Sequence, residues 1–308
     1  MSGEGLMADG PWTVAVSGSH GLIGSALVER LVASGHRVKR IVRSVSTGPD
    51  EVGWHPGQGR IEADQLEGVD AVVHLAGESI MGRWTKRKMQ RIRDSRVEGT
   101  RVLAQALASL SHRPRVLVSA SAMGYYGDRG DELLDESSAP GQGFLPQVCI
   151  EWEQAAEPAR AAQIRVVHAR MGLVLSERGG ALAQMLPIFR LGLGGRLGDG
   201  RMWWSWIALE DAVGAIIHAL QTPAISGPMN VASPNPVTNR QFTRVLARVL
   251  RRPAVLPVPR WAAYLALGRM AREGLFSSVR LRPGQLERTG YVFDHPDLEP
   301  ALRAILGR

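Results

Sequence analysis

The residues best suited to chemistry lie near the start of the chain, where glycine recurs at every third position. Gly18, Gly21 and Gly24 follow a short apolar run and precede a stretch with helical spacing. Glycines allow a tight turn and a close approach of the backbone to a ligand, and a helix that begins there offers free N–H groups to an anion. Although the spacing G-x-x-G-x-x-G departs from the simplest fingerprint, its place between a strand and a helix predicts a loop that binds the pyrophosphate of a dinucleotide. The expected contacts are Gly18, Ser19, His20, Gly21, Leu22, Ile23 and Gly24.

A basic side chain follows the next expected strand. Proteins that bind NAD place an acidic residue there, because a carboxylate hydrogen-bonds the hydroxyls of the ribose. Here the strand runs into Ile41-Val42-Arg43-Ser44 and supplies no acid. Since a guanidinium fork suits a 2′-phosphate, Arg43 favours NADP(H) over NAD(H) as the cofactor. The alternative is that Arg43 is an ordinary surface arginine.

Apolar runs and helical stretches alternate along the first 170 residues. This alternation is typical of an α/β fold, a doubly wound parallel sheet with helices on both faces, whose ligands lie beyond the carboxyl ends of the strands. After residue 170 comes a glycine-rich segment and then a tryptophan cluster that either lines a substrate cleft or fastens a C-terminal part to the core. The expected strands are 13–17, 36–43, 71–75, 115–119, 165–169 and 228–232, and the expected helices are 22–34, 96–110, 151–162, 209–220, 238–250 and 261–273.

The composition is that of a folded chain from a reducing compartment. Of 308 residues, 44% are hydrophobic and 21% are charged, so the chain is too apolar to be disordered. The single Cys149 excludes a disulfide framework and a cysteine-based zinc site, and the histidines lack metal-ligand spacing, so no metal is expected. No apolar run is long enough to span a membrane. We therefore expect a cytoplasmic protein, with residues 1–11 as a disordered tail.

The positive charge is concentrated at the C-terminal end. From residue 239 to residue 308 there are thirteen arginines and five acidic residues, a surplus equal to the net charge of +8 of the whole chain. No DNA-binding motif accompanies these arginines, so nucleic acid is not an expected partner. They are interpreted as solvated helix faces, the alternative being attraction to an anion or to a membrane surface. Arg190 and Arg196, which lie among glycines, could hold an anionic group of a small-molecule substrate.

Several longer motifs occur in one order and carry a resemblance to a known family. They include HLAGESI (74–80), SASAMGYYGDRG (119–130), LDESSAPG (134–141), FRLGLGGRLGDG (189–200) and GYVFDHPDL (290–298). With the glycine loop, they make the chain similar to the atypical extended short-chain dehydrogenase/reductases. Within these, it resembles the epimerase family of SDR family 39U, which has an NAD-dependent epimerase/dehydratase-like N-terminal part and a C-terminal domain of unknown function (DUF1731).

The resemblance implies a domain organisation and a set of cofactor contacts. It implies a Rossmann-like domain at 12–172, to which 207–232 return, and a smaller C-terminal substrate domain made of 173–206 and 233–308. The cofactor contacts of the family correspond to the glycine loop and to residues that follow later strands or lie on the next helix. These are Val42, Arg43, Leu75, Ala76, Arg96 and Val174.

The catalytic pair of ordinary short-chain dehydrogenases is missing. In that pair, Tyr-x-x-x-Lys on one helix, the lysine lowers the pKa of the tyrosine so that the phenol exchanges a proton near neutral pH. Aligned through Glu153, the tyrosine position is Leu145 and the lysine position is Cys149, and no lysine follows Lys88. The usual dyad therefore cannot form, and Cys149 itself is more simply interpreted as inert core than as a nucleophile.

Three interpretations of the catalytic machinery remain open. Tyr125 or Tyr126 could serve as the proton donor with Ser121 polarising a carbonyl, although both tyrosines could equally pack in the core or line the pocket. A carboxylate could act as the base, and Glu78 is the best candidate among the acids near the strand ends, which are Glu78, Asp128, Asp135, Glu136 and Glu153. Otherwise the protein binds NADP(H) without turnover.

Together these observations predict an NADP(H)-binding oxidoreductase or epimerase-type enzyme that acts on an unidentified small molecule. The main alternative is a non-catalytic regulatory or binding protein that depends on NADP(H). A methyltransferase with a similar glycine loop is less consistent with the residues, because Arg43 stands where an acid would grip the adenosine ribose. Nothing in the sequence indicates the oligomeric state.

Overall fold

The computed structural model describes residues 10–46 and 48–308, so most of the predicted N-terminal tail lies outside the described residues. Its centre is an eight-stranded sheet in the order β12-β8-β6-β5-β1-β2-β3-β4. All neighbouring strands run parallel except β3 and β4, which pair antiparallel. The strands of this sheet are β1 (Thr13–Ser17), β2 (Arg37–Val42), β3 (Glu51–His55), β4 (Arg60–Ile61), β5 (Ala71–His74), β6 (Val116–Ala122), β8 (Arg165–Met171) and β12 (Gly227–Val231).

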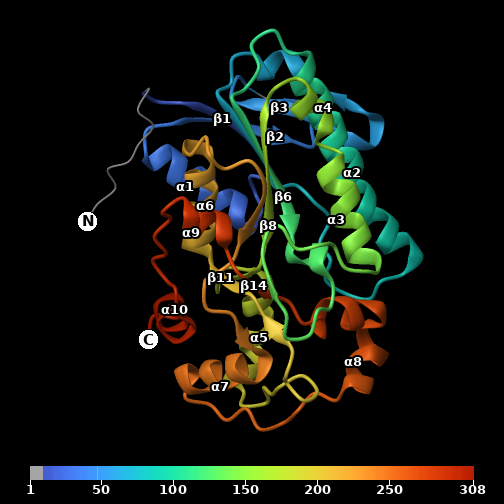
Figure 1. Cartoon of the computed structure of the whole chain (residues 1–308), viewed down its shortest axis with the longest axis vertical. Coiled ribbons are helices and arrows are strands. Elements are labelled where there is room, and N and C mark those ends of the chain that lie inside the picture. Colours follow the sequence, from blue (N-terminus) through green and yellow to red (C-terminus); the bar gives the residue numbers. More distant parts are fainter. Residues whose placement is uncertain (1–9, 47) are drawn as a thin grey trace.

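Helices cover both faces of this sheet, which confirms the predicted doubly wound α/β fold (Figure 1). The helices are α1 (Leu22–Ala33), α2 (Lys86–Ser109), α3 (Phe144–Gln154), α4 (Glu157–Ala161), α5 (Gly180–Arg190), α6 (Leu209–Gln221), α7 (Asn239–Leu250), α8 (Arg260–Leu267), α9 (Gly284–Arg288) and α10 (Leu298–Ile305). Short pairs of strands complete the fold: β7 (Leu133–Leu134) with β14 (Arg280–Leu281), β9 (Leu173–Leu175) with β11 (Trp206–Ala208), and β10 (Trp203–Trp204) with β13 (Val237–Thr238).

Alternation along the strands divides the apolar side chains between the two faces. Val14 and Val16 of β1 join a core that includes residues of α1 and α6, whereas Ala15 between them joins a core with residues of α2 and α4. Successive side chains of a strand point to opposite faces, so a continuous apolar run is what a sheet covered on both sides requires. The sheet is thus a rigid platform whose strand ends can hold a site.

A third hydrophobic core lies outside the sheet. It is built by α5, α7, α8 and α10 together with Trp204 and Trp206, so these two tryptophans are packing residues. Leu286 of α9 belongs instead to the core on the α1 side of the sheet, and Tyr291 and Phe293 pack against that core. This segment therefore returns to the Rossmann-like part, whereas the sequence placed all of 233–308 in the C-terminal part. The remaining predicted boundaries stay predictions.

Three expected helices differ from the structure. The expected helix 96–110 begins ten residues earlier, at Lys86, where the Thr85 side chain caps it by accepting the Lys88 N–H. The expected helix 151–162 is two helices, α3 and α4. The expected helix 261–273 is α8 followed, after a break, by a π-helical turn at Ala271–Leu275. Short 3-10 turns lie at Pro56–Gln58, Ala63–Leu66 and Met123–Tyr126 (η3).

In the described part of the chain, no helix is both long and apolar enough to cross a membrane.

Candidate functional site

The carboxyl ends of β5, β1 and β2 lie side by side in the sheet, and each is followed by a predicted cofactor-binding segment. The glycine loop follows β1, Arg43 follows β2, and Leu75 and Ala76 follow β5. Because parallel strands end at one edge, the fold brings these three segments together.

The glycines of the loop have different structural roles. Gly18 has a φ of 67°, and a Cβ there would lie 2.8 Å from the Leu75 carbonyl carbon. A Cβ at Gly24 would lie 2.2 Å from the Gly18 carbonyl oxygen. These two glycines allow the turn to close and to pack against β5. At Gly21 the φ is −76°, and a Cβ would meet only the Gly18 oxygen, at 3.2 Å. The space beside Gly21 is therefore open to a ligand.

The start of α1 offers donors to that ligand. Gly21 is the N-cap of the helix, and neither a side-chain cap nor an acidic residue occupies the first turn. The first N–H groups of a helix have no acceptor within it, and the helix dipole adds a partial positive charge. The geometry fits the pyrophosphate of a dinucleotide.

A buried hydrogen bond joins Ser17, the residue before the glycine loop, to His74 at the end of β5. The Ser17 hydroxyl lies 2.6 Å from His74 Nδ1 and accepts the Leu75 N–H at 3.2 Å. Burial lowers the pKa of His74 to about 4, so its ring is neutral. The contact joins the ends of β1 and β5.

Arg43 is exposed at the end of β2, and no hydrogen bond or ion pair joins its guanidinium to another residue of the described ranges. Val42 before it is half-buried. A free guanidinium beside a phosphate-binding loop is suited to a second phosphate group.

The other predicted contacts lie around the loop. Leu22, Ile23, Leu75 and Val174 all pack against the same core. Arg96 of α2 donates to the Glu78 carbonyl at 2.9 Å and lies 5.0 Å from the centroid of the Trp152 ring, so it holds the segment after β5 in place. The structure brings these residues together. Whether each one contacts the cofactor stays a prediction.

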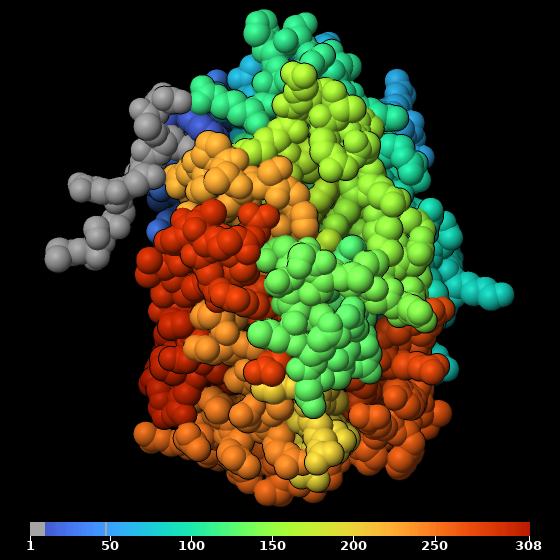
Figure 2. All heavy atoms as spheres, viewed as in Figure 1, coloured from blue at the N-terminus to red at the C-terminus, as the bar shows by residue number. Residues whose placement is uncertain are grey.

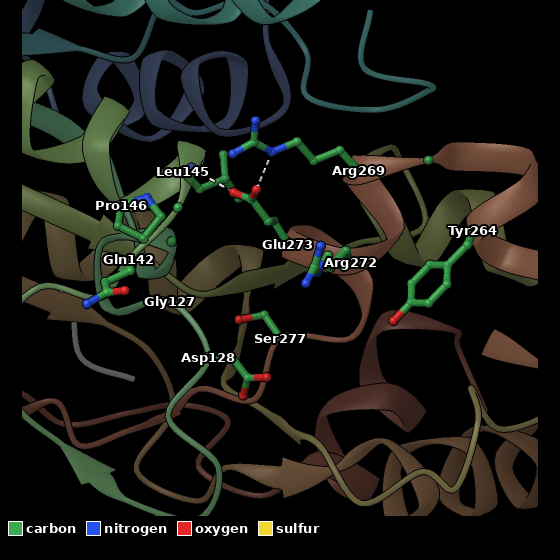
Figure 3. A pocket seen from close by; sticks show the side chains of 13 residues that line it. Gly127, Asp128, Gln142, Leu145, Pro146, Tyr264, Arg269, Arg272, Glu273 and Ser277 are labelled. Carbon is green, nitrogen blue, oxygen red and sulfur yellow. Dashed lines mark hydrogen bonds and ion pairs between the residues drawn. The ribbon is translucent and has the colours of Figure 1, made fainter. Parts of the chain in front are cut away.

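A cleft of about 1000 Å³ lies between the segment after β6 and the segment around α8 (Figure 3). Glu273 closes one side of it by accepting the Phe144 and Leu145 N–H groups at 2.7 and 3.1 Å, thereby capping α3. Arg269 pairs with Glu273, whereas Arg272 has no ion-pair partner among the described residues. The polar and charged lining comprises Asp128, Gln142, Tyr264, Arg269, Arg272, Glu273 and Ser277.

Most of this lining has no signal in the sequence. Of its polar residues, only Asp128 is among the acids predicted near the strand ends. Tyr264 and Arg272 come from α8 and the π-helical turn, more than 100 residues after Gln142 in the chain. No local pattern marks them as neighbours, because only the packing of the C-terminal part against α3 creates the cleft.

The structure argues against Tyr126 as a catalytic residue. Its side chain is 0% exposed, its hydroxyl donates to Asn230 Oδ1 at 2.7 Å, and it accepts from Arg170 at 2.9 Å. Burial raises its pKa to about 12. Tyr126 thus belongs to a buried network in which its hydroxyl proton is already donated, and this favours the core-packing alternative over a catalytic role.

Ser121 belongs to the same network. Its hydroxyl donates to Glu153 at 2.7 Å, and Glu153 binds Arg170 through two hydrogen bonds of 2.9 Å. Tyr125 is half-buried, with the Arg170 guanidinium 3.5 Å from its ring centroid, and its hydroxyl has no hydrogen bond to the described residues. Neither residue lines the cleft, although Gly124, which precedes Tyr125, and Gly127, which follows Tyr126, do. Of the hydroxyl candidates, only Tyr125 keeps a free donor, and its role stays a prediction.

Glu78 is held as a carboxylate in an ion pair. Its oxygen lies 2.7 Å from Lys88 Nζ and 3.5 Å from Arg91 Nε, and the hydrogen bond from Lys88 lowers its pKa. A proton acceptor with a lowered pKa is a weak base near neutral pH. The geometry therefore disfavours Glu78 as the general base, and it too lies outside the cleft.

The two positions that the sequence aligns with the tyrosine and lysine of the dyad both lie on α3. Leu145 lines the cleft, and Cys149 lies one helical turn further along α3 with its side chain buried. A Cβ at Gly124 would lie 3.3 Å from Leu145 and 3.8 Å from the Cys149 sulfur, so both face the segment after β6. The absence of the Tyr-x-x-x-Lys dyad stays a prediction.

Cys149 is expected to be unreactive in the folded protein. Its side chain is 2% exposed, and burial raises its pKa to about 12. At pH 8 only about one thiol in 10,000 is then a thiolate, the form that reacts. A thiol reagent at pH 8 should label the native protein at least ~1,000-fold more slowly than glutathione. The same protein in denaturant is the control and should react fully. Rapid labelling without denaturant would contradict the burial of this thiol.

Comparison with known proteins places the chain in a family. The model of the NAD dependent epimerase/dehydratase family matches residues 14–232, and that of a domain of unknown function, DUF1731, matches residues 258–305. The chain is 46% identical to the epimerase family protein Mb2239 of Mycobacterium bovis, over 94% of this chain and 96% of that protein. It is 34% identical to the human epimerase family protein SDR39U1, over 95% of this chain and 99% of that one.

A solved structure shows the same fold. The crystal structure of human SDR39U1 (isoform 2) with NADPH superposes with a TM-score of 0.87 at 32% identity, covering 96% of this chain and 99% of that chain. With the glycine loop at the edge of a parallel sheet, these matches confirm the family resemblance seen in the motifs. The chain belongs to the NAD dependent epimerase/dehydratase family and has its NAD(P)-binding fold, with a DUF1731 domain at its C-terminal end.

Proposed function

We propose that this protein binds NADP(H) and acts as an atypical short-chain dehydrogenase/reductase, an oxidoreductase or epimerase-type enzyme on a small molecule. The observation that carries the proposal is the free guanidinium of Arg43 beside the glycine loop, where an NAD-binding site would have an acid. The crystal structure of human SDR39U1 with NADPH supports the same cofactor.

The residues have distinct tasks in this proposal. The start of α1 would hold the pyrophosphate and Arg43 the 2′-phosphate, while the Ser17–His74 contact keeps the loop in place. When bound, the nicotinamide supplies a centre that gives or accepts hydride. Arg272, exposed in the cleft without an ion-pair partner in the described ranges, would attract an anionic group of the substrate. Tyr125 is the remaining hydroxyl that could donate a proton.

Arg43→Ala tests the choice of cofactor. The variant should bind NADPH about ten- to a hundredfold more weakly, because charge-assisted hydrogen bonds are worth roughly 1.5–3 kcal/mol, and its affinity for NADH should change by less than about twofold. Isothermal titration calorimetry with both cofactors measures this. Arg113→Ala, an exposed arginine just before β6 at the opposite edge of the sheet, is the control and should change neither affinity. An unchanged preference for NADPH in Arg43→Ala would refute the assignment.

The residues at the two dyad positions favour a second candidate function. With Leu145 and buried Cys149 in place of tyrosine and lysine, the protein could bind NADP(H) and serve as a regulatory or binding protein without turnover. The two functions differ in the oxidation of NADPH, followed by its absorbance, in the presence of a panel of carbonyl compounds. The enzyme is supported if NADPH is oxidised and if Tyr125→Phe abolishes this oxidation without changing the affinity for NADPH. Tight NADPH binding with no oxidation by any compound supports the second function.

A further inference from the structure

A second groove lies on the C-terminal part of the molecule and differs from the cleft in every lining residue. Its volume is about 990 Å³, and it lies along α7 and the loop that follows. α7 and this loop (orange) form the lower end of the molecule, away from the sheet (Figures 1 and 2). The lining contains no acidic residue. It includes six arginines: Arg196, Arg240, Arg244, Arg248, Arg251 and Arg252.

Helical spacing places these arginines in one row. Arg240, Arg244 and Arg248 recur every four residues and are exposed, whereas Phe242, Leu246 and other apolar residues of α7 are buried in the third core. Residues four apart lie one above the other on the same face of a helix. The amphipathic pattern therefore presents a stripe of guanidinium groups to the groove.

Most of these charges are not neutralised. Arg248 lies 2.8 Å from a Glu299 carboxylate oxygen, but no other groove arginine has an ion pair within the described ranges. Arg196 and Arg240 donate only to backbone carbonyls, those of Gly198 and Asp199. Like charges held close together repel, so the arrangement is unfavourable in the absence of an anion.

The helix dipole explains only part of the cluster. Arg248, Arg251 and Arg252 lie at the C-terminal end of α7, where cations are favourable. Arg240 lies in the first turn, where a positive charge is unfavourable. A Cβ at Gly200 would contact both Arg240 and Arg196, at 3.0 and 3.3 Å from their Cβ atoms, so these two stand together at that end of the helix.

Arg251 has an unusual backbone. Its φ is 53°, one of two positive values among the described non-glycine residues, and it stands at the helix-ending position where glycine is preferred. Its N–H and that of Arg252 both donate to the end of α7, so the turn itself is a regular helix ending. The chain thus has an arginine where a glycine would fold more easily, and this arginine lines the groove.

We propose that this groove is a binding site for a small organic molecule with two or more phosphate groups, separate from the cofactor site and the cleft. Guanidinium forks match phosphate oxygens in pairs, and the row from Arg240 to Arg251 spans about 16 Å at the rise of an α-helix. A row of that length has room for several phosphate groups and a small organic portion. Pro253, Ala254 and Val255 add an apolar wall for the organic portion.

Calorimetry with inorganic tripolyphosphate tests the site, using the full chain saturated with NADPH so that the glycine loop is filled. We expect binding that weakens as salt is raised. Arg244→Gln combined with Arg251→Gly should weaken it about tenfold or more. The second substitution relieves the backbone strain at Arg251, so the melting temperature should not fall. Arg87→Gln, which removes an exposed charge on α2, should change the affinity by less than about twofold.

Several results would overturn the proposal. One is the absence of heat with tripolyphosphate, and another is an equal loss of affinity in Arg87→Gln and in the double variant. Sedimentation with phosphatidylglycerol vesicles and titration with a short DNA duplex examine the other polyanions. The protein could bind either of these polyanions more tightly than tripolyphosphate, with the same dependence on Arg244 and Arg251. That result would assign the groove to a membrane surface or to nucleic acid instead.

Discussion

Gly21→Val is expected to lower the affinity for NADPH by about a hundredfold or more, roughly 2.7 kcal/mol, while the protein stays folded. The φ of −76° at this position suits any residue, and a Cβ meets only the Gly18 carbonyl oxygen, at 3.2 Å. The branched side chain would instead fill the space at the start of α1 where the pyrophosphate must approach the backbone. Isothermal titration calorimetry measures the affinity, and thermal unfolding without cofactor measures the stability.

Two other glycines serve as controls for this experiment. Gly57→Val, at an exposed glycine where a Cβ would meet nothing within 4 Å, should leave the affinity unchanged. Gly24→Ala should destabilise the protein itself, because its Cβ would lie 2.2 Å from the Gly18 carbonyl oxygen. An affinity in Gly21→Val close to that of the unmodified protein would show that the phosphates do not bind at this loop.

Arg170→Met is expected to reduce the free energy of unfolding by about 3–5 kcal/mol, the loss typical when one partner of a buried ion pair is removed. The side chains of Arg170 and Glu153 are 3% and 13% exposed. Burial by itself lowers the pKa of Arg170, but the hydrogen bonds and the charge of Glu153 outweigh it and raise that pKa. Without the guanidinium, Glu153 keeps an unpaired charge in the interior, and the Tyr126 hydroxyl loses a donor. Urea unfolding measures the change.

Two control variants test whether the expected loss of stability comes from the burial of the ion pair. Arg37→Met removes one partner of the exposed Arg37–Asp50 pair, with side chains 58% and 60% exposed, and should cost less than about 1 kcal/mol. Combining Arg170→Met with Glu153→Leu should recover part of the loss, because the double variant leaves no unpaired buried charge. A loss in Arg170→Met as small as that in Arg37→Met would contradict the buried network that ties α3 to β8.

Local patterns were reliable where an element is buried along its whole length. The strand predicted at 13–17 coincides with β1, and the helix predicted at 209–220 differs from α6 by one residue. In such segments the burial requirement appears as an unbroken apolar run or a 3.6-residue period. No such pattern marks the charged first turns of α2 or the strand β3, which contains a glycine. The sequence therefore predicted neither of them. Their stability comes from a cap and from pairing with β2 and β4.

The sequence by itself determined six of the eight strands of the sheet, the glycine loop and the family, because each is set by residue types within short stretches. Only the tertiary structure decided the burial and the hydrogen-bond partners of the catalytic candidates. It buries Tyr126 and ties Ser121 to Glu153, and it forms the cleft from two segments more than 100 residues apart. The physical reason is that the burial and free hydrogen-bonding capacity of a side chain depend on what packs against it, and those neighbours are remote in the sequence.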